Sequence, residues 1–207
     1  MIIPNSERVT GRSQPADPAK IPDDWRTYVP DYATLLEEAN GITIDHGIFR
    51  VFGAGQSTLS RDALAWNNEA WRARYRLSHN IVLWAENVFG DQYGVDRNNG
   101  ALVLLNCEGG LLERLPYKTI KLCLEHIVLG PPSEWIEVDL VRAAYERGLR
   151  ASLTEHLSFV LPLICGGKAD VENLEVMDGA AHLDVLGQIV EQSRGLPNGT
   201  PIGRFRT

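Results

Sequence analysis

Two apolar runs lie close together between residues 80 and 106, and this stretch predicts the centre of a β-sheet. One apolar run covers residues 81–84 and a second covers residues 101–105. The dipeptide Asn99-Gly100 stands just before the second run and favours the positive φ angles of a tight hairpin turn. We therefore predict two strands with a structured connection between them, and we expect the remaining elements to pack around this pair.

Helical spacing of apolar residues predicts helices on both sides of this stretch, while the alternation over residues 48–52 predicts a further strand. Ser60 and Ser133 are expected to cap two of the helices. The predicted helices cover residues 31–39, 60–75, 119–128, 133–148 and 180–190. Residues 119–128 leave a strand open as the alternative, because they begin with residues that favour β structure. This order of elements is typical of an α+β fold, in which helices flank a central antiparallel sheet.

The chain divides into three segments by composition. Residues 1–22 hold four prolines among small and polar residues, which predicts an extended arm that Ile2 and Ile3 can dock on the body. Residues 23–150 form the predicted α+β core, and residues 151–207 form a C-terminal extension of helix and strand. No low-complexity linker separates these segments, so we expect the extension to pack on the core as part of one compact unit.

The charge and the cysteine content exclude several classes of function. The net charge of −7 argues against a nucleic-acid-binding protein, since such proteins usually carry a basic stripe, but it permits a basic protein partner. The three cysteines lack disulfide or zinc spacing and are expected to be free thiols in a reducing compartment. The chain shows no signal-peptide pattern and no apolar run near the roughly 18 residues of a membrane span. We therefore expect a cytoplasmic protein without a cofactor, a metal or a membrane partner.

Enzyme motifs are missing from the sequence, which contains no nucleophile elbow, no Walker loop and no metalloprotease pattern. Gly53-Ala54-Gly55 follows a predicted strand, but the rest of a phosphate-binding loop is lacking, so a plain strand exit is expected. Cys165 with His182 as its base is the best candidate for a thiol enzyme, although such a cysteine is more often simply buried. The five histidines stand singly and are expected at the surface or at helix ends. We predict no catalytic residues.

Two clusters allow either a binding function or a structural one. Glu86, Asp91 and Asp96 can gather near one end of the predicted hairpin and bind a cation, but the loop spacing of a calcium site is missing, so solvated turn residues are preferred. Three tryptophans allow an aromatic cage for a ligand, but core filling is preferred because large rings contribute mostly apolar area. These tryptophans are Trp66, Trp71 and Trp84.

Several motifs occur in an order that resembles one known family. A helix that starts with Pro and carries Leu-Leu ends in Asn-Gly over residues 30–41, and Gly-x-Phe-Arg-x-Phe follows at residues 47–52. The most specific segment is Phe-Gly-Asp-Gln-Tyr at residues 89–93. This order resembles the SUKH superfamily, which includes yeast glucan-synthesis regulators and many bacterial immunity proteins. Residues 162–189 also resemble the C-terminal part of some bacterial members.

The resemblance implies an α+β fold with a central antiparallel sheet and without catalytic residues. Bacterial members of the superfamily typically bind and neutralise a cognate toxin, often one delivered by contact-dependent or type VI secretion. The chain departs from the family by its proline-rich arm and by the insert at Pro131-Pro132, and such insertions often carry partner specificity.

We therefore expect a non-enzymatic immunity protein that binds one toxin through aromatic anchors and acidic residues, which would steer a basic partner. The expected contact residues are Trp84, Glu86, Asp91 and Asp96. The alternative is a regulatory scaffold or protein-binding module without a toxin partner. The sequence predicts no oligomeric state.

Overall fold

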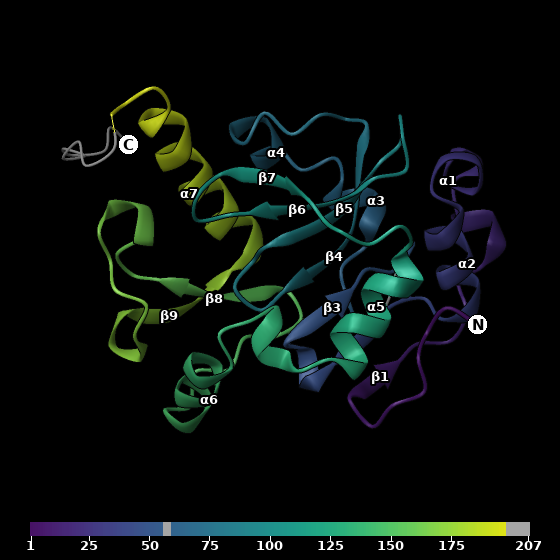
Figure 1. Cartoon of the computed structure of the whole chain (residues 1–207), viewed down its shortest axis with the longest axis horizontal. Helices are drawn as coiled ribbons and strands as arrows, with labels where there is room; N and C mark the ends of the chain where they lie inside the picture. The colour runs from purple at the N-terminus through teal and green to yellow at the C-terminus, as the bar shows by residue number, and fades with distance from the viewer. Residues whose placement is uncertain (56–58, 198–207) are drawn as a thin grey trace.

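A computed structural model describes residues 1–55 and 59–197, and this part of the chain is built around one seven-stranded sheet (Figure 1). Each strand pairs antiparallel with the next one along the chain, so the sheet order is the sequence order. The α+β fold expected from the sequence is confirmed. The strands are β1 (Val9–Arg12), β2 (Ile42–Ile44), β3 (Phe49–Val51), β4 (Ile81–Asn87), β5 (Gln92–Asp96), β6 (Leu102–Asn106) and β7 (Leu111–Arg114).

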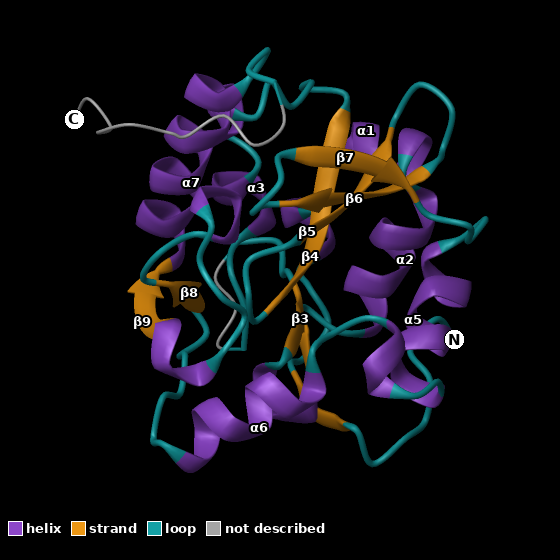
Figure 2. Ribbon diagram, turned by 60° about the vertical axis from the view of Figure 1, so that its left-hand side comes forward, coloured by secondary structure: helices purple, strands orange, loops and turns teal. Residues whose placement is uncertain are grey.

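Helices lie on opposite sides of this sheet, with α1, α2 and α5 on one side and α7 on the other (Figures 1 and 2). The helices are α1 (Asp23–Tyr28), α2 (Pro30–Glu38), α3 (Ala63–Trp66), α4 (Trp71–Arg74), α5 (Ile120–Leu129), α6 (Val138–Glu146) and α7 (Gly179–Ser193). Short 3-10 turns are η1 (Pro18–Lys20), η2 (Asp45–Gly47), η3 (Pro132–Glu134), η4 (Leu163–Cys165) and η5 (Val171–Asn173).

The centre of the sheet is β4, as the apolar pattern predicts. All seven of its residues are buried, and β3 and β5 pair with it on either side. The prediction of only two strands in this stretch was wrong, because the connection itself contains β5. The polar Gln92 and the side-chain-free Gly94 hide the alternation of β5 in the sequence. The predicted Asn99-Gly100 turn is confirmed between β5 and β6, where Gly100 has a φ of 71°.

Most predicted helices are present, but two of their starts were wrong. α5 is a helix rather than a strand, and Thr119 caps it by accepting a hydrogen bond from the amide of Leu122. The predicted helix over residues 60–75 is instead two four-residue helices, and Asp62 rather than Ser60 caps the first of them. α6 begins at Val138 because the residues after Pro131 form a 3-10 turn, which leaves Ser133 outside the helix.

The elements that the apolar pattern missed are short. Strands β1, β2 and β7 have three or four residues each, and α1 has six. A repeat of two or of 3.6 residues cannot be recognised over so few positions. Pairing with a neighbouring strand, rather than local sequence preference, decides that these segments become strands.

The N-terminal segment, residues 1–22, runs along the body and adds β1 to the edge of the sheet. Ile3 is 1% exposed, and Ile2 is also buried. The carboxylate of Glu38 at the end of α2 accepts hydrogen bonds from the amides of both isoleucines, at 2.6 Å from Ile2 and 3.2 Å from Ile3. Apolar burial and a charge-assisted contact therefore hold the first residues in place.

The C-terminal part consists of a ribbon of β8 (Glu155–Phe159) and β9 (Leu174–Asp178), which is followed by α7. The amide of Leu157 in β8 donates to the carbonyl of Val88, the residue that follows β4, at 2.8 Å. α7 packs closely on α4, since a Cβ added at Gly187 would lie 2.5 Å from the Cβ of Arg74. A second, smaller apolar cluster forms between this ribbon, α6 and the exit of β4.

Candidate functional site

A buried ionic cluster centred on Glu86 of β4 joins the sheet to the C-terminal part. Its Oε1 accepts a hydrogen bond from Nε of Arg61 at 2.9 Å and lies 3.4 Å from Nη1 of Arg50. Its Oε2 lies 3.1 Å from Nε2 of His156 and accepts a bond of 3.1 Å from Gln92. The side chain of Glu86 is 0% exposed, so these neighbours replace the whole of its hydration shell.

The cluster extends from the sheet into the C-terminal part through both arginines. Nη2 of Arg61 donates to the carbonyl of Thr154 at 2.9 Å, and Nη1 of Arg50 donates to that of Ser152 at 2.9 Å. The guanidinium of Arg61 also lies over the ring of Trp66, 4.0 Å from its centroid. The cluster thus holds the segment before β8 against β3 and β4, and its groups are buried rather than open to a substrate.

The expectation that Glu86 is a solvated turn residue was therefore wrong. Glu86 lies inside β4, and Trp84, 0% exposed on the same strand, packs on Phe49 and Tyr93. Neither side chain is accessible to a partner in this conformation, because β4 is covered on both faces. The preferred interpretation of the tryptophans as core is confirmed, since Trp66 and Trp71 are also buried.

The two other acidic residues lie at opposite ends of β5 and do not meet, so the alternative of an acidic cation site at one end of the hairpin, which was not preferred, is wrong. Asp96 shapes the turn after β5, where it accepts hydrogen bonds from the amide of Asn98 and from Nδ2 of Asn99. Asp91 precedes β5 and accepts from the amide of Cys107 at 2.9 Å. Of the expected contact residues, Asp91 is the one that lines a pocket.

Two histidines occupy the cluster, contrary to the expectation that all five lie at the surface or at helix ends. His156 is 0% exposed and His182 on α7 is 2% exposed, and their Nδ1 atoms lie 3.1 Å apart. Burial lowers the pKa of both imidazoles, that of His182 to about 3, although Glu86 opposes this shift at His156. Burial also acts to raise the pKa of Glu86, but Arg61 and His156 outweigh it and hold that pKa below its ordinary value.

We expect the buried histidines to make the fold less stable in mild acid. The unfolded chain binds protons near pH 6.5 that the folded chain excludes, so the free energy of unfolding falls as the pH falls below that value. For His182 the expected loss between pH 7 and pH 5 is about 2 kcal/mol. Urea unfolding at pH 5, 6 and 7 measures it. Carboxyl groups with pKa values near 4 add little in this range, but Glu108, whose pKa is raised to about 6, gains stability as the pH falls and opposes the loss, so the comparison with a His182 variant isolates the histidine.

His182→Gln should flatten this pH dependence, while His79→Gln, which changes an exposed histidine, is the matched control and should leave the slope unchanged. Equal slopes in the wild type and in His182→Gln would show that burial of His182 is not the cause.

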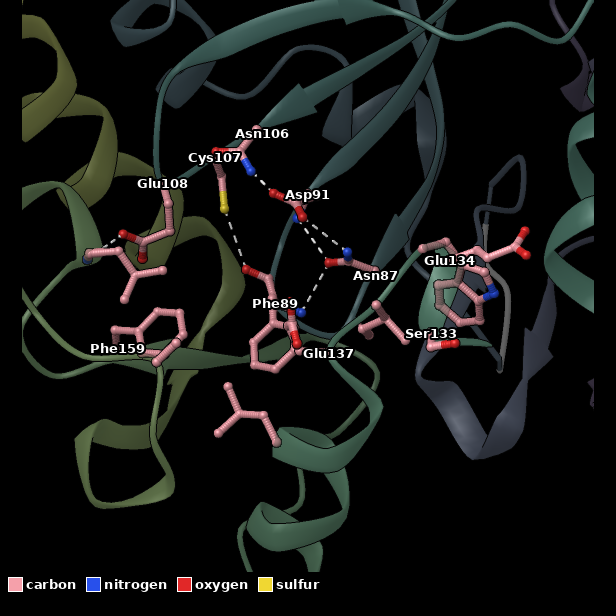
Figure 3. A pocket seen from close by; sticks show the side chains of 15 residues that line it. Asn87, Phe89, Asp91, Asn106, Cys107, Glu108, Ser133, Glu134, Glu137 and Phe159 are labelled. Carbon is pink, nitrogen blue, oxygen red and sulfur yellow. Dashed lines mark hydrogen bonds between the residues drawn. The ribbon is translucent and has the colours of Figure 1, made fainter. Parts of the chain in front are cut away.

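A pocket of about 370 Å³ opens beside the cluster, at the turn between β4 and β5 (Figure 3). Asn87 shapes this turn, because its Oδ1 accepts hydrogen bonds from the amides of Phe89 and Asp91, at 3.1 and 3.0 Å. Gly90 sits in the middle of the turn with a φ of 91°. The segment Phe89–Asp91, which carried the family resemblance, therefore forms one wall of the pocket.

The opposite walls come from three other segments that are distant in the sequence. The end of β6 and the loop after it supply residues 106–108. The turn before α6 and the first turn of that helix supply 133–137 and Leu140. The end of β8 and the segment after it supply Phe159, Leu163 and Ala169. The rings of Phe89 and Phe159 stack at 6.0 Å with an angle of 3° between their planes. The two stacked rings thus give the pocket an aromatic surface, which connects the β4–β5 turn to the C-terminal part.

Carboxylates dominate the polar lining of the pocket. Those of Asp91 and Glu108 lie deep, and those of Glu134 and Glu137 lie on exposed residues at the rim. Oε2 of Glu108 accepts from the amide of Leu163 at 2.7 Å, whereas its Oε1 is buried and has no hydrogen-bond partner in the described part of the chain. Burial raises the pKa of Glu108 to about 6 and that of Asp91 above its ordinary value.

The other candidate chemistries gain no support from the described residues. Cys165 is half-buried, burial raises the pKa of its thiol, and His182 contacts His156 instead. Within residues 1–55 and 59–197, no group of three or more acidic, histidine or cysteine side chains is placed to hold a metal ion. Over the same residues, no helix is long and apolar enough to cross a membrane. The three cysteines are unpaired.

The sequence did not place the following residues in the cluster or the pocket: Arg50, Arg61, His156, His182 and Glu108. One signal was available, since Arg50 interrupts an otherwise apolar strand between Phe49 and Val51. A charge at such a position requires a buried partner of opposite sign. The identity of that partner depends on which segments meet in space.

Comparisons with known proteins support an immunity family for part of the chain. Residues 132–190 match the sequence model described as "T6SS immunity protein Tdi1, C-terminal". The fold is similar to that of a solved structure described as "Crystal structure of Atu4351 from Agrobacterium tumefaciens". The TM-score is 0.57 and the sequence identity 15%, with 88% of this chain and 86% of the other covered. No curated protein sequence matches the chain.

Proposed function

We propose that this chain is a non-enzymatic immunity protein that binds and neutralises a cognate toxin delivered by type VI secretion. The observation that carries the proposal is the match of residues 132–190 to the C-terminal region of a type VI immunity protein. That region supplies α6, the β8–β9 ribbon and most of α7. The resemblance of residues 25–128 to the SUKH superfamily supports the same role independently.

The buried cluster and the pocket fit a protein-binding role better than a catalytic one. His156, His182 and Arg50 are buried beside Glu86, so a substrate has no access to them in this conformation. The pocket, by contrast, is open at an acidic rim on which Glu134 is 53% exposed. We place the protein in the cytoplasm, as the compartment in which an intracellular toxin would have to be met.

Co-expression with the toxin encoded beside this gene tests the proposal. We expect the chain to restore growth to cells that make the toxin and to co-purify with it, because neutralisation by binding requires a stable complex. Growth curves and size-exclusion chromatography of the purified pair measure the two effects.

Cys165→Ser should protect as well as the wild type, since the proposal gives the thiol no role. If the wild-type chain gave no protection and formed no complex with the toxin, the proposal would be contradicted. A deletion phenotype in isolated cells, without any toxin present, would favour the regulatory scaffold instead.

A further inference from the structure

The acidic pocket between the β4–β5 turn and the segment before α6 has a lining that favours a positively charged group. Among the described residues that line it, four carry carboxylates and none is lysine, arginine or histidine. The imidazole of His126 lies outside the lining, with its Nε2 3.5 Å from Oε2 of Glu134 at the rim. The pocket therefore contains an excess of negative charge that its own walls do not neutralise.

One carboxylate oxygen in the pocket lacks a partner. Oε1 of Glu108 is buried without a hydrogen bond, while Oε2 of the same group is held by the amide of Leu163. An unsatisfied buried acceptor costs free energy, and more so when it is ionised. A donor with positive charge that enters the pocket would satisfy it.

The apolar part of the pocket restricts what kind of cation fits. The stacked rings of Phe89 and Phe159, together with Trp135 and Leu140, provide an apolar surface next to the carboxylates. The side chains of lysine and arginine combine an apolar stem with a charged end, and arginine also stacks on aromatic rings. A compact metal ion would gain nothing from such a surface.

The place of the pocket favours an occupant that projects from another protein. Ser133, Glu134 and Glu137 at the rim are exposed, so the opening faces solvent. The rim and the α6 wall fall within the segment that matches the immunity-protein family. The insert at Pro131-Pro132, one of the departures from the SUKH pattern, leads directly into this rim.

We propose that this pocket receives a lysine or arginine side chain from a basic surface of the toxin, with Glu108 and Glu137 as its main carboxylate contacts. The proposal rests on the proposed function and adds to it the binding site and the chemistry of the partner. Asp91 also lines the pocket, where its carboxylate accepts a hydrogen bond from the amide of Cys107.

The test compares two double variants with the same change in net charge. Glu108→Gln/Glu137→Gln removes two carboxylates from the pocket, and Glu69→Gln/Glu113→Gln removes two exposed ones that do not line it. Binding to the toxin encoded beside the gene is measured by surface plasmon resonance at physiological salt. The pocket variant should bind about 30-fold or more weakly, mainly through faster dissociation, whereas the control should change by less than about 3-fold.

Single Glu137→Gln guards against a folding defect, because this residue is exposed and its side chain makes no capping bond to α6. It should weaken binding by about 5-fold or more, as expected for one hydrogen bond to a charged group, without a change in Tm. Equal affinity of wild type and pocket variants would overturn the pocket proposal and leave the immunity function standing. A wild-type chain that does not bind the toxin would overturn both.

A charge exchange identifies the occupant. Glu137→Arg should abolish binding, and replacing the matching basic residue of the toxin by glutamate should restore it. A pocket that binds spermidine with the same dependence on Glu108, while toxin binding stays unaffected by either variant, would show that a small polyamine is the occupant and that the proposal is wrong.

Discussion

Replacing Glu86 by glutamine should lower the free energy of unfolding by about 3–5 kcal/mol, the largest effect that we expect of any single substitution here. The change keeps the size of the side chain but removes the charge between Arg50 and Arg61. Burial already lowers the pKa of the Arg50 guanidinium, and Glu86 counteracts this. Without the carboxylate, two guanidinium groups would remain close together with little water around them. Urea unfolding at pH 7 measures the loss.

Glu113→Gln is the matched control for this prediction. Glu113 lies exposed on β7, at the edge of the sheet, and its replacement should change stability by less than about 0.5 kcal/mol. Adding Arg61→Gln to Glu86→Gln should recover part of the lost stability, because it removes one of the two uncompensated charges. If Glu86→Gln and Glu113→Gln were equally stable, the buried cluster would contribute little to the fold.

Replacing Gly90 by alanine should destabilise the protein by about 2–5 kcal/mol, as the sum of backbone strain and overpacking. Gly90 has a φ of 91°, which a residue with a Cβ rarely adopts. A Cβ at this position would lie 2.8 Å from Nδ1 of His156 and 3.2 Å from Nδ1 of His182. The substitution therefore forces apart the histidine pair that joins β8 to α7. Thermal and urea unfolding measure the effect.

Gly100→Ala separates the two causes. Gly100 also has a positive φ, 71°, but a Cβ there would meet no atom within 4 Å. Its replacement should cost only the strain, about 1–2 kcal/mol. The difference between the two variants then reports the contact with the histidines. A cost for Gly90→Ala no greater than that for Gly100→Ala would mean that the turn adjusts and that the histidine pair tolerates the added methyl group.

Gly90→Ala also tests how the fold positions the pocket. Gly90 lies between Phe89 and Asp91, which line the pocket, and the histidine pair lies directly behind the turn. The Phe-Gly-Asp-Gln-Tyr segment therefore has two structural roles. Its glycine allows the C-terminal part to approach, and its phenylalanine and aspartate face the opening.

Local signals determined the elements that the sequence predicts well. The apolar run that begins at Ile81 predicted the central strand, Asn99-Gly100 predicted a hairpin turn, and the helical spacing over residues 119–128 predicted α5. Each of these depends on neighbours within a few residues, so composition and spacing are sufficient. The α+β class and the absence of known catalytic motifs follow from the same kind of evidence.

Only the tertiary structure decided which polar residues belong together. Glu86 and His156 are 70 positions apart, and Glu108 and Leu163 are 55 apart, yet each pair is in contact. The sequence does not distinguish a charged residue that will be exposed to water from one that will be buried with a partner. Its environment depends on which segments the apolar core brings side by side. For that reason the sequence alone identified Asp91 as a candidate contact, but misplaced Glu86 and the two histidines and left the acidic pocket unseen.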